Sequence, residues 1–286
     1  MLSALEKANV LTEALPYIQS FAGKTIVIKY GGAAMDNPAL EELVLKDIIL
    51  MKLVGMNPVV VHGGGPAINE ALKKINVQPK FINGLRVTDE AVMEVVEMVL
   101  AGKLNKGIVG KMNSYGGKAV GICGKDGDLI EAQKIAGPDD LGLVGEVVKI
   151  NPEIIVTLTR EGYIPVLAPI GIGAAGETLN INADYVAGAL GGALNAHKLI
   201  LLTDVEGIYL GEGPESLASR LTQNEIHGLI ARGVISGGMI PKAESCLKAL
   251  EAGVENVHIV DGRKPHSLLL EIFTKEGIGT MVMKDE

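Results

Sequence analysis

Apolar residues follow two different patterns along this chain. From Thr25 onward, short continuous runs of apolar, mostly β-branched residues alternate with longer stretches in which apolar positions recur at helical spacing. The short runs predict strands and the longer stretches predict helices. Continuous apolar strands are typical of a sheet that is covered by helices on both faces, so the sequence predicts an α/β protein with a mostly parallel sheet.

The same patterns give the expected boundaries of these elements. Strands are expected at residues 25–30, 58–62, 119–123, 146–150, 163–168, 198–204 and 256–261. Helices are expected at residues 39–54, 66–75, 89–103, 108–114, 152–161, 183–194, 223–231, 241–252 and 266–274. No composition change marks a linker near residues 170–195, so the two halves of the chain are expected to share one sheet.

The segment before the first strand has its own apolar pattern. Between residues 2 and 21, leucines such as Leu5, Leu11 and Leu15 stand at roughly helical spacing, and Pro16 should kink the helix or end its first part. Two interpretations remain open for this segment. It is either a helix that covers the sheet or an arm that joins subunits.

Composition and charge narrow the class of ligand. The 286 residues carry a formal net charge of −8, which argues against a nucleic acid as the main partner but not against a nucleotide in a locally basic site. The five histidines show no metal-binding spacing, so no protein-bound metal is expected. Two distant cysteines indicate a reduced, cytoplasmic protein. Neither a membrane span nor a signal peptide is indicated.

Two strands end in glycines immediately before a helix. These are “IVIKYGG” at residues 26–32 and “VVVHGGGPAI” at residues 59–68. Such corners direct free backbone N–H groups toward an anion at the helix start. A tight turn without a ligand is the alternative. Lys29 adds a cation to the first corner, and a lysine in a covered sheet is costly unless it meets an anion. The alternative is a lysine that is solvated at the end of its strand.

Three further stretches contain polar side chains that could act on a ligand. In “SGGMIPKAES”, Lys242 lies in a first helical turn, where a cation is unfavourable against the helix dipole. Either an anion binds there, or the lysine is simply exposed to solvent. “LNINADYVAG” offers Asn180, Asn182 and Asp184, of which Asn182 also fits a helix N-cap. “NGLRVTD” offers Arg86, whose planar guanidinium suits a carboxylate, whereas its Thr88 can be read simply as an N-cap.

Two other glycine-rich stretches do not support a cofactor site. “GIGAAG” at residues 171–176 has the spelling of a dinucleotide-binding loop, but neither a helix nor the expected acidic residue follows it. “GICGKDG” at residues 121–127 lacks the spacing and the Ser/Thr of a P-loop. The remaining set of lysines, aspartate, arginine and glycines suits phosphoryl transfer, which depends on positioning and charge neutralisation.

These motifs together, with “LLTDVEGIY” and “GIGT” in the same order, closely resemble the amino acid kinase family, and within it the members that phosphorylate N-acetyl-L-glutamate. The resemblance covers nearly the whole chain. It implies a three-layer α/β/α fold with an open, mainly parallel central sheet and an N-terminal helical arm at residues 1–22. It also implies an acetylglutamate-binding half at residues 23–190 and a nucleotide-binding half at residues 191–286.

The resemblance implies specific roles for residues of both halves. Lys29 and Lys242 would neutralise the migrating phosphoryl group, and Asp184 would organise them. The backbone N–H groups of Gly31 and Gly32 would bind the phosphate. The acetylglutamate contacts would be Gly64, Gly65, Arg86 (on the α-carboxylate), Asn180 and Asn182. The nucleotide pocket would comprise Thr203, Asp204, Val205, Glu206, Gly207, Ile208, Val234, Ile235 and Ser236.

The implied reaction is ATP-dependent phosphorylation of the γ-carboxylate of N-acetyl-L-glutamate, an early step of arginine biosynthesis. Mg²⁺ would arrive with ATP, held largely by phosphates and water. The carboxylate is already ionised at neutral pH, so the reaction needs no general base. Closure that excludes water is expected, since the acyl phosphate product hydrolyses readily.

The N-terminal helix resembles that of arginine-inhibited, hexameric members of the family, which are trimers of dimers. The residues expected to line an arginine site are Tyr17, Lys198, His258, Glu271 and Gly277. Feedback inhibition by arginine and a hexameric assembly are therefore expected. The sequence leaves open whether a PII-type signalling protein binds.

Three alternatives differ from this interpretation. Another amino acid kinase, such as aspartokinase or glutamate 5-kinase, shares the lysine corners but not the substrate motifs. A non-catalytic ligand sensor on the same fold would be favoured by the loss of Lys29 or Lys242, and both are present. A dinucleotide-dependent dehydrogenase is disfavoured by the context of “GIGAAG”.

Overall fold

The computed structural model describes residues 3–211, 213–275 and 277–285. Within them, eight strands form one open sheet in the order β12-β14-β13-β11-β1-β2-β8-β5. Strand β14 pairs antiparallel with β13, and the other neighbours in the sheet pair in parallel. The strands are β1 (Thr25–Tyr30), β2 (Asn57–His62), β5 (Ala119–Cys123), β8 (Ile164–Ala168), β11 (Lys198–Thr203), β12 (Arg220–Thr222), β13 (Asn256–Asp261) and β14 (Thr280–Met283).

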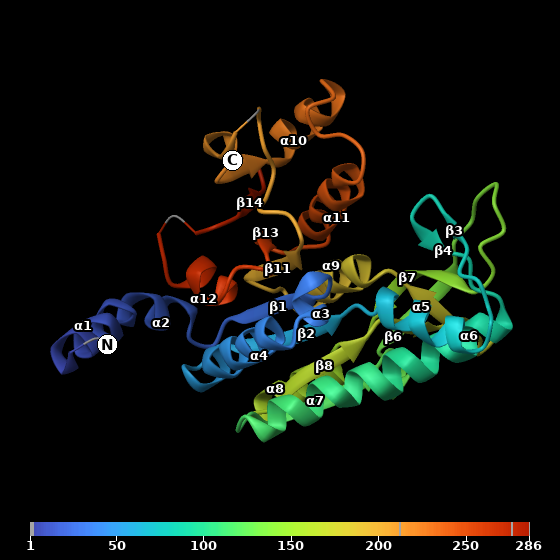
Figure 1. The fold of residues 1–286 in the computed structure, drawn as a ribbon, viewed down its shortest axis with the longest axis horizontal. Coiled ribbons are helices and arrows are strands. Elements are labelled where there is room, and N and C mark those ends of the chain that lie inside the picture. The colour runs from blue at the N-terminus through green and yellow to red at the C-terminus, as the bar shows by residue number, and fades with distance from the viewer. Residues whose placement is uncertain (1–2, 212, 276, 286) are drawn as a thin grey trace.

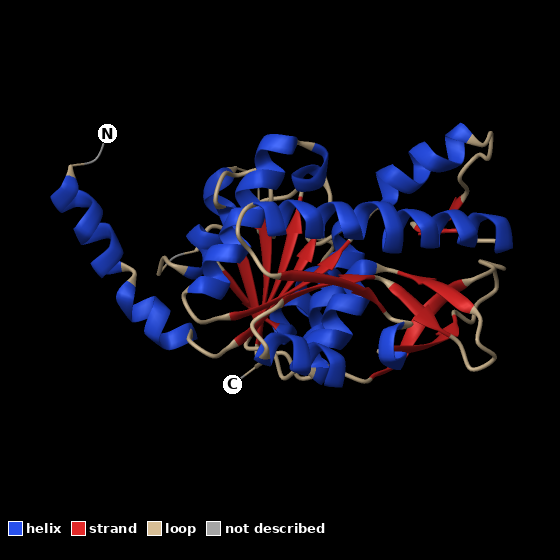
Figure 2. Cartoon of the chain, turned by 90° about the horizontal axis from the view of Figure 1, so that it is seen from below, coloured by secondary structure: helices blue, strands red, loops and turns tan. Residues whose placement is uncertain are grey.

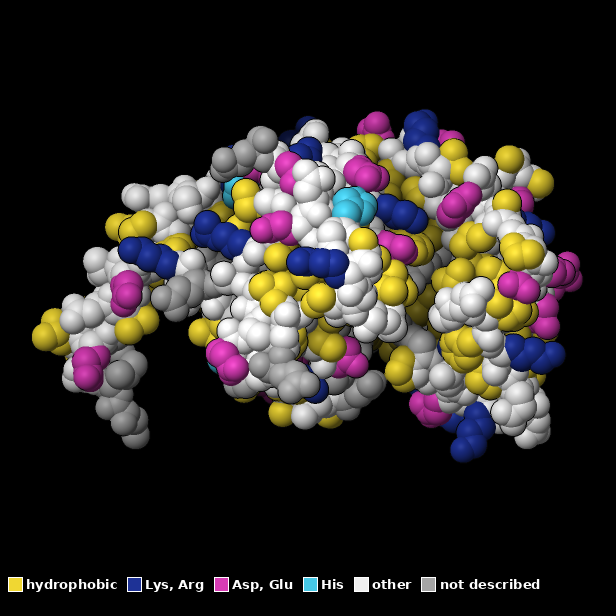
Figure 3. Space-filling view, turned by 90° about the horizontal axis from the view of Figure 1, so that it is seen from above, with side chains coloured by type: hydrophobic (Ala, Val, Ile, Leu, Met, Phe, Trp, Pro, Cys, Tyr) yellow, Lys and Arg dark blue, Asp and Glu magenta, His cyan; other side chains and the backbone are white. Residues whose placement is uncertain are grey.

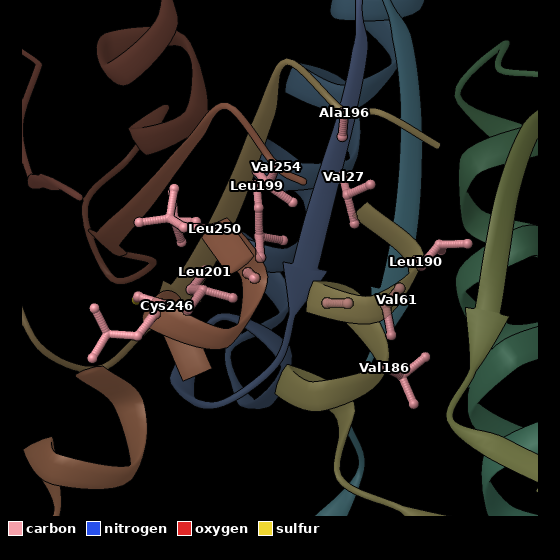
Figure 4. Close-up of a cluster of buried hydrophobic side chains, with 14 of the residues drawn as sticks. Val27, Val61, Val186, Leu190, Ala196, Leu199, Leu201, Cys246, Leu250 and Val254 are labelled. Atoms are coloured by element: carbon pink, nitrogen blue, oxygen red, sulfur yellow. The ribbon is translucent and has the colours of Figure 1, made fainter. Parts of the chain in front are cut away.

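Helices cover both faces of this sheet (Figures 1 and 2). Alternate side chains of β1 point to opposite faces of the sheet. Val27 belongs to the core formed with α9 and α11, whereas Ile26 and Ile28 belong to the core formed with α4, α7 and α12. Figure 4 shows the cluster around Val27. The bounds are α3 (Ala33–Asp36), α4 (Pro38–Leu53), α5 (Gly65–Lys74), α6 (Glu90–Glu97), α7 (Asn105–Ser114), α8 (Glu153–Arg160), α9 (Ala183–Ala193), α10 (Gln223–Ala231), α11 (Met239–Glu251) and α12 (Ser267–Ile272). The predicted three-layer α/β/α fold is confirmed.

A second, smaller group of strands lies beside the sheet, at the right of Figure 2. Strands β6 (Ile130–Lys134), β7 (Val144–Ile150), β9 (Ile170–Ile172) and β10 (Thr178–Ile181) form a closed barrel. The strand expected at residues 146–150 is therefore β7 of this barrel and not part of the central sheet. Residues 171–176 comprise the end of β9 and most of the turn into β10, and the two strands pair antiparallel. This agrees with the rejection of a dinucleotide-binding loop.

One long helix replaces two expected ones. The helices expected at residues 89–103 and 108–114 are α6, a π-helical segment η1 (Met98–Leu104) and α7, in unbroken succession. Glycines 102, 107 and 110 lower the helical propensity of this region, but none meets a crowding atom and the apolar face is buried against the core. The remaining elements, all short, are β3 (Phe81–Ile82), β4 (Leu85–Arg86), η2 (Asp126–Asp128) and η3 (Pro214–Ser216).

The N-terminal segment forms two helices, α1 (Ala4–Glu13) and α2 (Leu15–Phe21), that project from the body (Figure 1). Ser3 and Glu6 close a capping box at the start of α1, and Pro16 occupies the first turn of α2 as the sequence predicts. The described side chains of α1 are all exposed, including Leu11 at 73%. The interpretation in which this segment covers the sheet is therefore wrong for α1.

No helix among the described residues is both long enough and apolar enough to cross a membrane.

A buried carboxylate links two helices of one layer. Asp47 on α4 is 1% exposed, and its Oδ1 lies 2.7 Å from His266 Nδ1, immediately before α12. Burial raises the pKa of Asp47 to about 6, although the hydrogen bond from His266 acts to lower it. A carboxyl group whose pKa is higher in the folded state stabilises the fold at low pH, and that contribution is lost as the pH rises from about 4 to about 6.

We therefore expect Asp47→Asn to flatten the pH dependence of stability. Urea unfolding midpoints at about pH 4.5 and about pH 7 should differ less for this variant than for the parent. Glu42→Gln, at an exposed position of the same helix, is the matched control and should keep the parental dependence. An Asp47→Asn variant with the same pH dependence as the parent would contradict the expectation.

Candidate active site

A cavity of about 550 Å³ lies at the carboxyl ends of β1 and β2, where the two glycine corners meet. Its walls come from both corners, the β3–β4 hairpin, η1, and the segment from Asn180 to Asp184 at the start of α9. Figure 3 shows a cleft on one face of the molecule, between the body and the smaller portion at the right. The sequence predicted a ligand at these strand ends, and the cavity lies there.

Lys29 and Asp184 meet in this cavity. Lys29 is the penultimate residue of β1, and Asp184 lies in the first turn of α9. The Lys29 Nζ lies 3.0 Å from Asp184 Oδ1, and both side chains are largely buried, at 16% and 21% exposed. A lysine in this covered strand end is thus paired with a carboxylate, and both groups remain accessible from the cavity.

Lys242 lies near this pair but does not line the cavity itself. Its Nζ donates a hydrogen bond to Thr203 Oγ1 at 2.6 Å, which joins the first turns of α11 to the end of β11. Burial lowers the pKa of Lys242, the carboxylates of Asp184 and Asp204 act to raise it, and the charge of Lys29 lowers it further. The structure therefore brings the two lysines and Asp184 within range of one another's charges, as the sequence predicted.

Arg86 is the most deeply buried cation of the cavity wall. It ends β4, is 7% exposed, and lies over the Phe81 ring at 4.7 Å from the ring centroid. Its Nη2 donates to the Gly65 carbonyl at 3.2 Å, whereas its buried Nη1 has no hydrogen-bond partner among the described residues. Burial lowers the pKa of Arg86. A buried guanidinium with a free donor suits a carboxylate ligand.

The polar residues beside Arg86 have defined structural contacts. Asn180 donates to Thr88 Oγ1 at 3.2 Å, and Thr88 donates to the Arg86 carbonyl at 2.9 Å. The helix after this segment is capped by Asp89, so the reading of Thr88 as the N-cap is wrong. Asn182 does cap α9, because its side chain accepts from the Asp184 N–H at 2.8 Å. Capping accounts for this bond, and a substrate contact of Asn182 stays a prediction.

The expected nucleotide residues lie at the ends of β11 and before α11. Thr203, Asp204 and Glu206 present polar side chains, and Glu206 pairs with Lys264 at 2.7 Å. The side chains of Ile208 and Ile235 are buried in the core. These two residues could therefore contact a nucleotide only through their backbone. The rest of the expected set is Val205, Gly207, Val234 and Ser236.

The expected arginine-site residues converge at a different place, where α2 and α12 approach the strand starts. Lys198 Nζ lies 2.8 Å from His258 Nε2, and His258 Nδ1 lies 2.6 Å from Glu271 Oε1. Gly277 adopts φ of +65° beside the Glu271 carboxylate. Tyr17 packs edge-on against Phe273 at the end of α12, with 6.4 Å between ring centroids.

Glu271 is already an acceptor for several donors. Its Oε2 accepts from the N–H groups of Ile278 at 2.7 Å and Gly279 at 3.2 Å. Burial acts to raise the pKa of Glu271, but the hydrogen bonds from His258 and these N–H groups hold it below its usual value. Glu271 is therefore an anion, and an arginine guanidinium would have to share it with His258.

Sequence reasoning missed one polar group behind the second glycine corner. His62 is fully buried, and Asn105 and Lys106 lie next to it in the fold. The signal was a histidine at the end of a strand and directly before three glycines, which is too common a context to interpret from one sequence.

A mainly parallel α/β/α sheet has Lys29, Asp184 and two glycine corners in one cavity, with Lys242 beside it, and this arrangement suits a small-molecule kinase. Residues 24–261 match the family model described as “Amino acid kinase family”, so the chain belongs to the amino acid kinase family. The family expected from the motifs is thereby confirmed.

Relatives within this family match over their full length. The chain is 60% identical over 295 residues to the acetylglutamate kinase of Heliobacterium modesticaldum, covering 99% of this chain and 100% of the relative. It is 58% identical to the acetylglutamate kinase of Pelotomaculum thermopropionicum, covering 98% of each. Among solved structures, the N-acetylglutamate synthase of Neisseria gonorrhoeae complexed with coenzyme A and N-acetyl-glutamate has a TM-score of 0.85 at 28% identity, over 96% of this chain and 63% of that one.

Proposed function

We propose that the chain transfers the γ-phosphoryl group of ATP to the γ-carboxylate of N-acetyl-L-glutamate, as a step of arginine biosynthesis. The products are N-acetyl-L-glutamyl 5-phosphate and ADP. The observation that carries the proposal is one cavity that combines the free Nη1 of Arg86 with the Lys29–Asp184 pair. The names of the full-length relatives support the same substrate.

In this proposal the chain acts by charge and position. The γ-carboxylate attacks the γ-phosphorus in line while ionised, so no side chain has to remove a proton. Two anions must approach each other, and Lys29 and Lys242 offset their repulsion. Asp184, 3.0 Å from Lys29, holds that ammonium in place. Gly31 and Gly32 supply backbone N–H groups to the phosphate, and ATP enters as its Mg²⁺ complex, which supplies further positive charge.

Acetylglutamate would bind in the half formed by residues 23–190. Arg86 would hold the α-carboxylate with Nη1, which has no hydrogen-bond partner among the residues that the structure describes. Gly64, Gly65 and Asn180, which line the same cavity, would contact the rest of the substrate, as would Asn182. The nucleotide would bind in the half formed by residues 191–286, along residues 203–208 and 234–236. The proposed compartment is the cytoplasm, in keeping with two free, buried cysteines.

A coupled ADP-release assay tests this proposal directly. Acetylglutamate, glutamate and aspartate should be compared as acceptors with MgATP. Acetylglutamate should be preferred by at least about a hundredfold in kcat/KM, because the cavity is proposed to make its contacts with the acetylated substrate. A preference for aspartate or glutamate would favour aspartokinase or glutamate 5-kinase, and no turnover with any acceptor would favour a ligand sensor.

We further propose that arginine inhibits the enzyme at the site of Lys198, His258 and Glu271, and that the arm formed by α1 and α2 joins dimers into a hexamer. Tyr17 connects the arm to this site through Phe273. A chain that lacks residues 1–20 should therefore be a dimer that keeps its turnover but no longer responds to arginine. Sedimentation and arginine titration of the ADP-release rate measure both effects.

The arm and the arginine contact can be separated with a second variant. Leu11→Glu places a charge on the exposed face of α1 and leaves Tyr17 unchanged, so it should break the hexamer through the arm alone. Glu13→Gln, also exposed and on the same helix, is the control that should stay hexameric. A truncated chain that remains hexameric, or that remains sensitive to arginine, would contradict this proposal.

A further inference from the structure

A buried polar group lies directly behind the second glycine corner. His62 ends β2 and is followed by Gly63 and Gly64, before α5 begins at Gly65. The imidazole is fully buried, and its Nδ1 lies 2.8 Å from the Gly63 carbonyl oxygen. The Asn105 Nδ2 lies 3.2 Å from its Nε2. Neither residue lines the cavity, and the proposed phosphoryl transfer uses neither.

The contacts of Asn105 determine which nitrogen of His62 carries the proton. Asn105 Nδ2 also lies 2.9 Å from the Val166 carbonyl, which can only accept, so the Asn105 amide is the donor on this side. Its other hydrogen faces His62 Nε2 at 3.2 Å and, at 3.4 Å, the Ile122 carbonyl of β5. Because the amide nitrogen is the donor in this contact, His62 Nε2 is the acceptor. Burial lowers the pKa of His62 to about 4, although the bond to Gly63 acts to raise it, so the ring is neutral. Nδ1 therefore donates to the Gly63 carbonyl.

Fixing this carbonyl also fixes an N–H group. The C=O and N–H of a trans peptide point in opposite directions. The Gly63 carbonyl is held toward the buried imidazole, so the N–H of Gly64 is directed away from it, on the side where Gly63, Gly64 and Gly65 line the cavity. This N–H has no hydrogen bond among the described backbone groups, so it is available to a ligand.

The π-helical segment η1, which ends immediately before Asn105, packs against Gly64. A Cβ on Gly64 would lie 2.5 Å from Leu100 Cδ2 and 2.5 Å from Leu104 Cδ1, both on η1. Asn105 follows η1 immediately, and π-helical turns are frequent at functional sites. Gly121 makes room for the amide, since a Cβ there would lie 1.9 Å from Asn105 Oδ1. The η1–α7 junction thus restricts the Gly64 backbone through Leu100 and Leu104, and it positions the His62 side chain through Asn105.

We propose that His62 and Asn105 are positioning residues that direct the Gly64 N–H at the anionic group of the bound substrate during phosphoryl transfer. This inference rests on the function proposed above. It predicts that substitutions in the pair impair the use of acetylglutamate and leave the binding of ATP unchanged, because the nucleotide is held by the other half of the chain.

Steady-state kinetics of the full-length chain test the proposal. His62→Leu and Asn105→Leu should each lower kcat/KM for acetylglutamate at least about tenfold, with KM for ATP changed less than about twofold. Because both act through one peptide group, the double variant should be no more than about twofold worse than the poorer single variant. His62→Asn keeps an N–H donor where the imidazole has Nδ1 and should restore activity to within about threefold of the parent.

Asn113→Leu is the matched control. Asn113 lies on the same helix α7 and also hydrogen-bonds β5, with its Oδ1 accepting from the Ala119 N–H at 2.7 Å, but it does not approach the glycine corner. It should lower the thermal unfolding temperature without changing kcat/KM for acetylglutamate. Asn105→Leu keeps the imidazole, so the test stands if His62→Leu does not fold.

The outcomes separate the two levels of the proposal. An active parent whose His62 and Asn105 variants keep their kinetics, or lose no more than Asn113→Leu, would overturn the positioning role alone. Failure of His62→Asn to restore activity would also overturn it. A parent without acetylglutamate-dependent ADP release would overturn the proposed function and this inference together.

Discussion

Lys242→Met should lower kcat by at least about a thousandfold, the scale of a cation that stabilises the charge of a transferred phosphoryl group. The ammonium is half-buried near Asp184, Lys29 and Thr203, so methionine removes its charge and keeps most of its volume. The substitution removes a cation from an early turn of α11, where it opposes the helix dipole. We therefore expect the variant to be as stable as the parent. Its lost activity would then measure the contribution of Lys242 to the phosphoryl-transfer step.

Single-turnover measurement of acyl phosphate formation, with the thermal unfolding temperature of each variant, checks this prediction. Lys248→Met is the control, because Lys248 lies on the same helix with its Nζ 4.7 Å from the centroid of the Tyr185 ring, and it is exposed. It should change kcat less than about twofold. A Lys242→Met variant that keeps a tenth or more of the parental rate would exclude Lys242 from the phosphoryl-transfer step.

Arg86→Gln should raise KM for acetylglutamate about a hundredfold or more and leave KM for ATP unchanged. A buried guanidinium that binds a carboxylate is worth a few kcal/mol, and glutamine has no charge to replace it. The free protein should lose little stability, because the buried Nη1 of Arg86 has no described protein partner. What is lost is the contact over Phe81, worth about 1 kcal/mol, together with the 3.2 Å hydrogen bond from Nη2 to the Gly65 carbonyl.

Titration calorimetry with acetylglutamate measures this effect without turnover. Arg160→Gln is the control, because Arg160 is exposed on α8 and pairs with the exposed Glu161 at 3.5 Å. It should bind acetylglutamate as the parent does. An Arg86→Gln variant with a dissociation constant within about fivefold of the parental one would show that Arg86 does not hold the substrate carboxylate.

The elements predicted well are those defined by local patterns. The strands at residues 25–30, 119–123 and 256–261 and the helix at residues 223–231 have the expected bounds. Buried parallel strands have continuous apolar runs, which are visible in a single sequence. Several of the expected site residues, among them Lys29, Arg86 and Asp184, line one cavity, whereas Lys242 lies beside it. The ends of neighbouring parallel strands lie at one edge of the sheet, which brings such residues together. Lys29 on β1 and the corner after His62 on β2 are one such case.

The features that were missed depend on pairing between distant segments. The barrel strands β6, β9 and β10 are short and contain polar or glycine residues, and each becomes stable only beside its neighbours. The joining of α6, η1 and α7 depends on packing against the core rather than on helix propensity. The roles of Thr88, His62 and Asn105 depend on which carbonyl or side chain each meets, and no spacing in the sequence reveals that.

The exposed leucines of α1 would make the stability of this protein depend on its concentration if the proposed assembly through the arm forms. If the arm joins subunits, the surface of Leu5 and Leu11 leaves water only when a second molecule covers it. Melting temperature would then rise as the solution is made more concentrated, and dilution would loosen the arm before it affects the sheet. The unit that natural selection has stabilised would be the assembly, and a lone chain would be its least durable form.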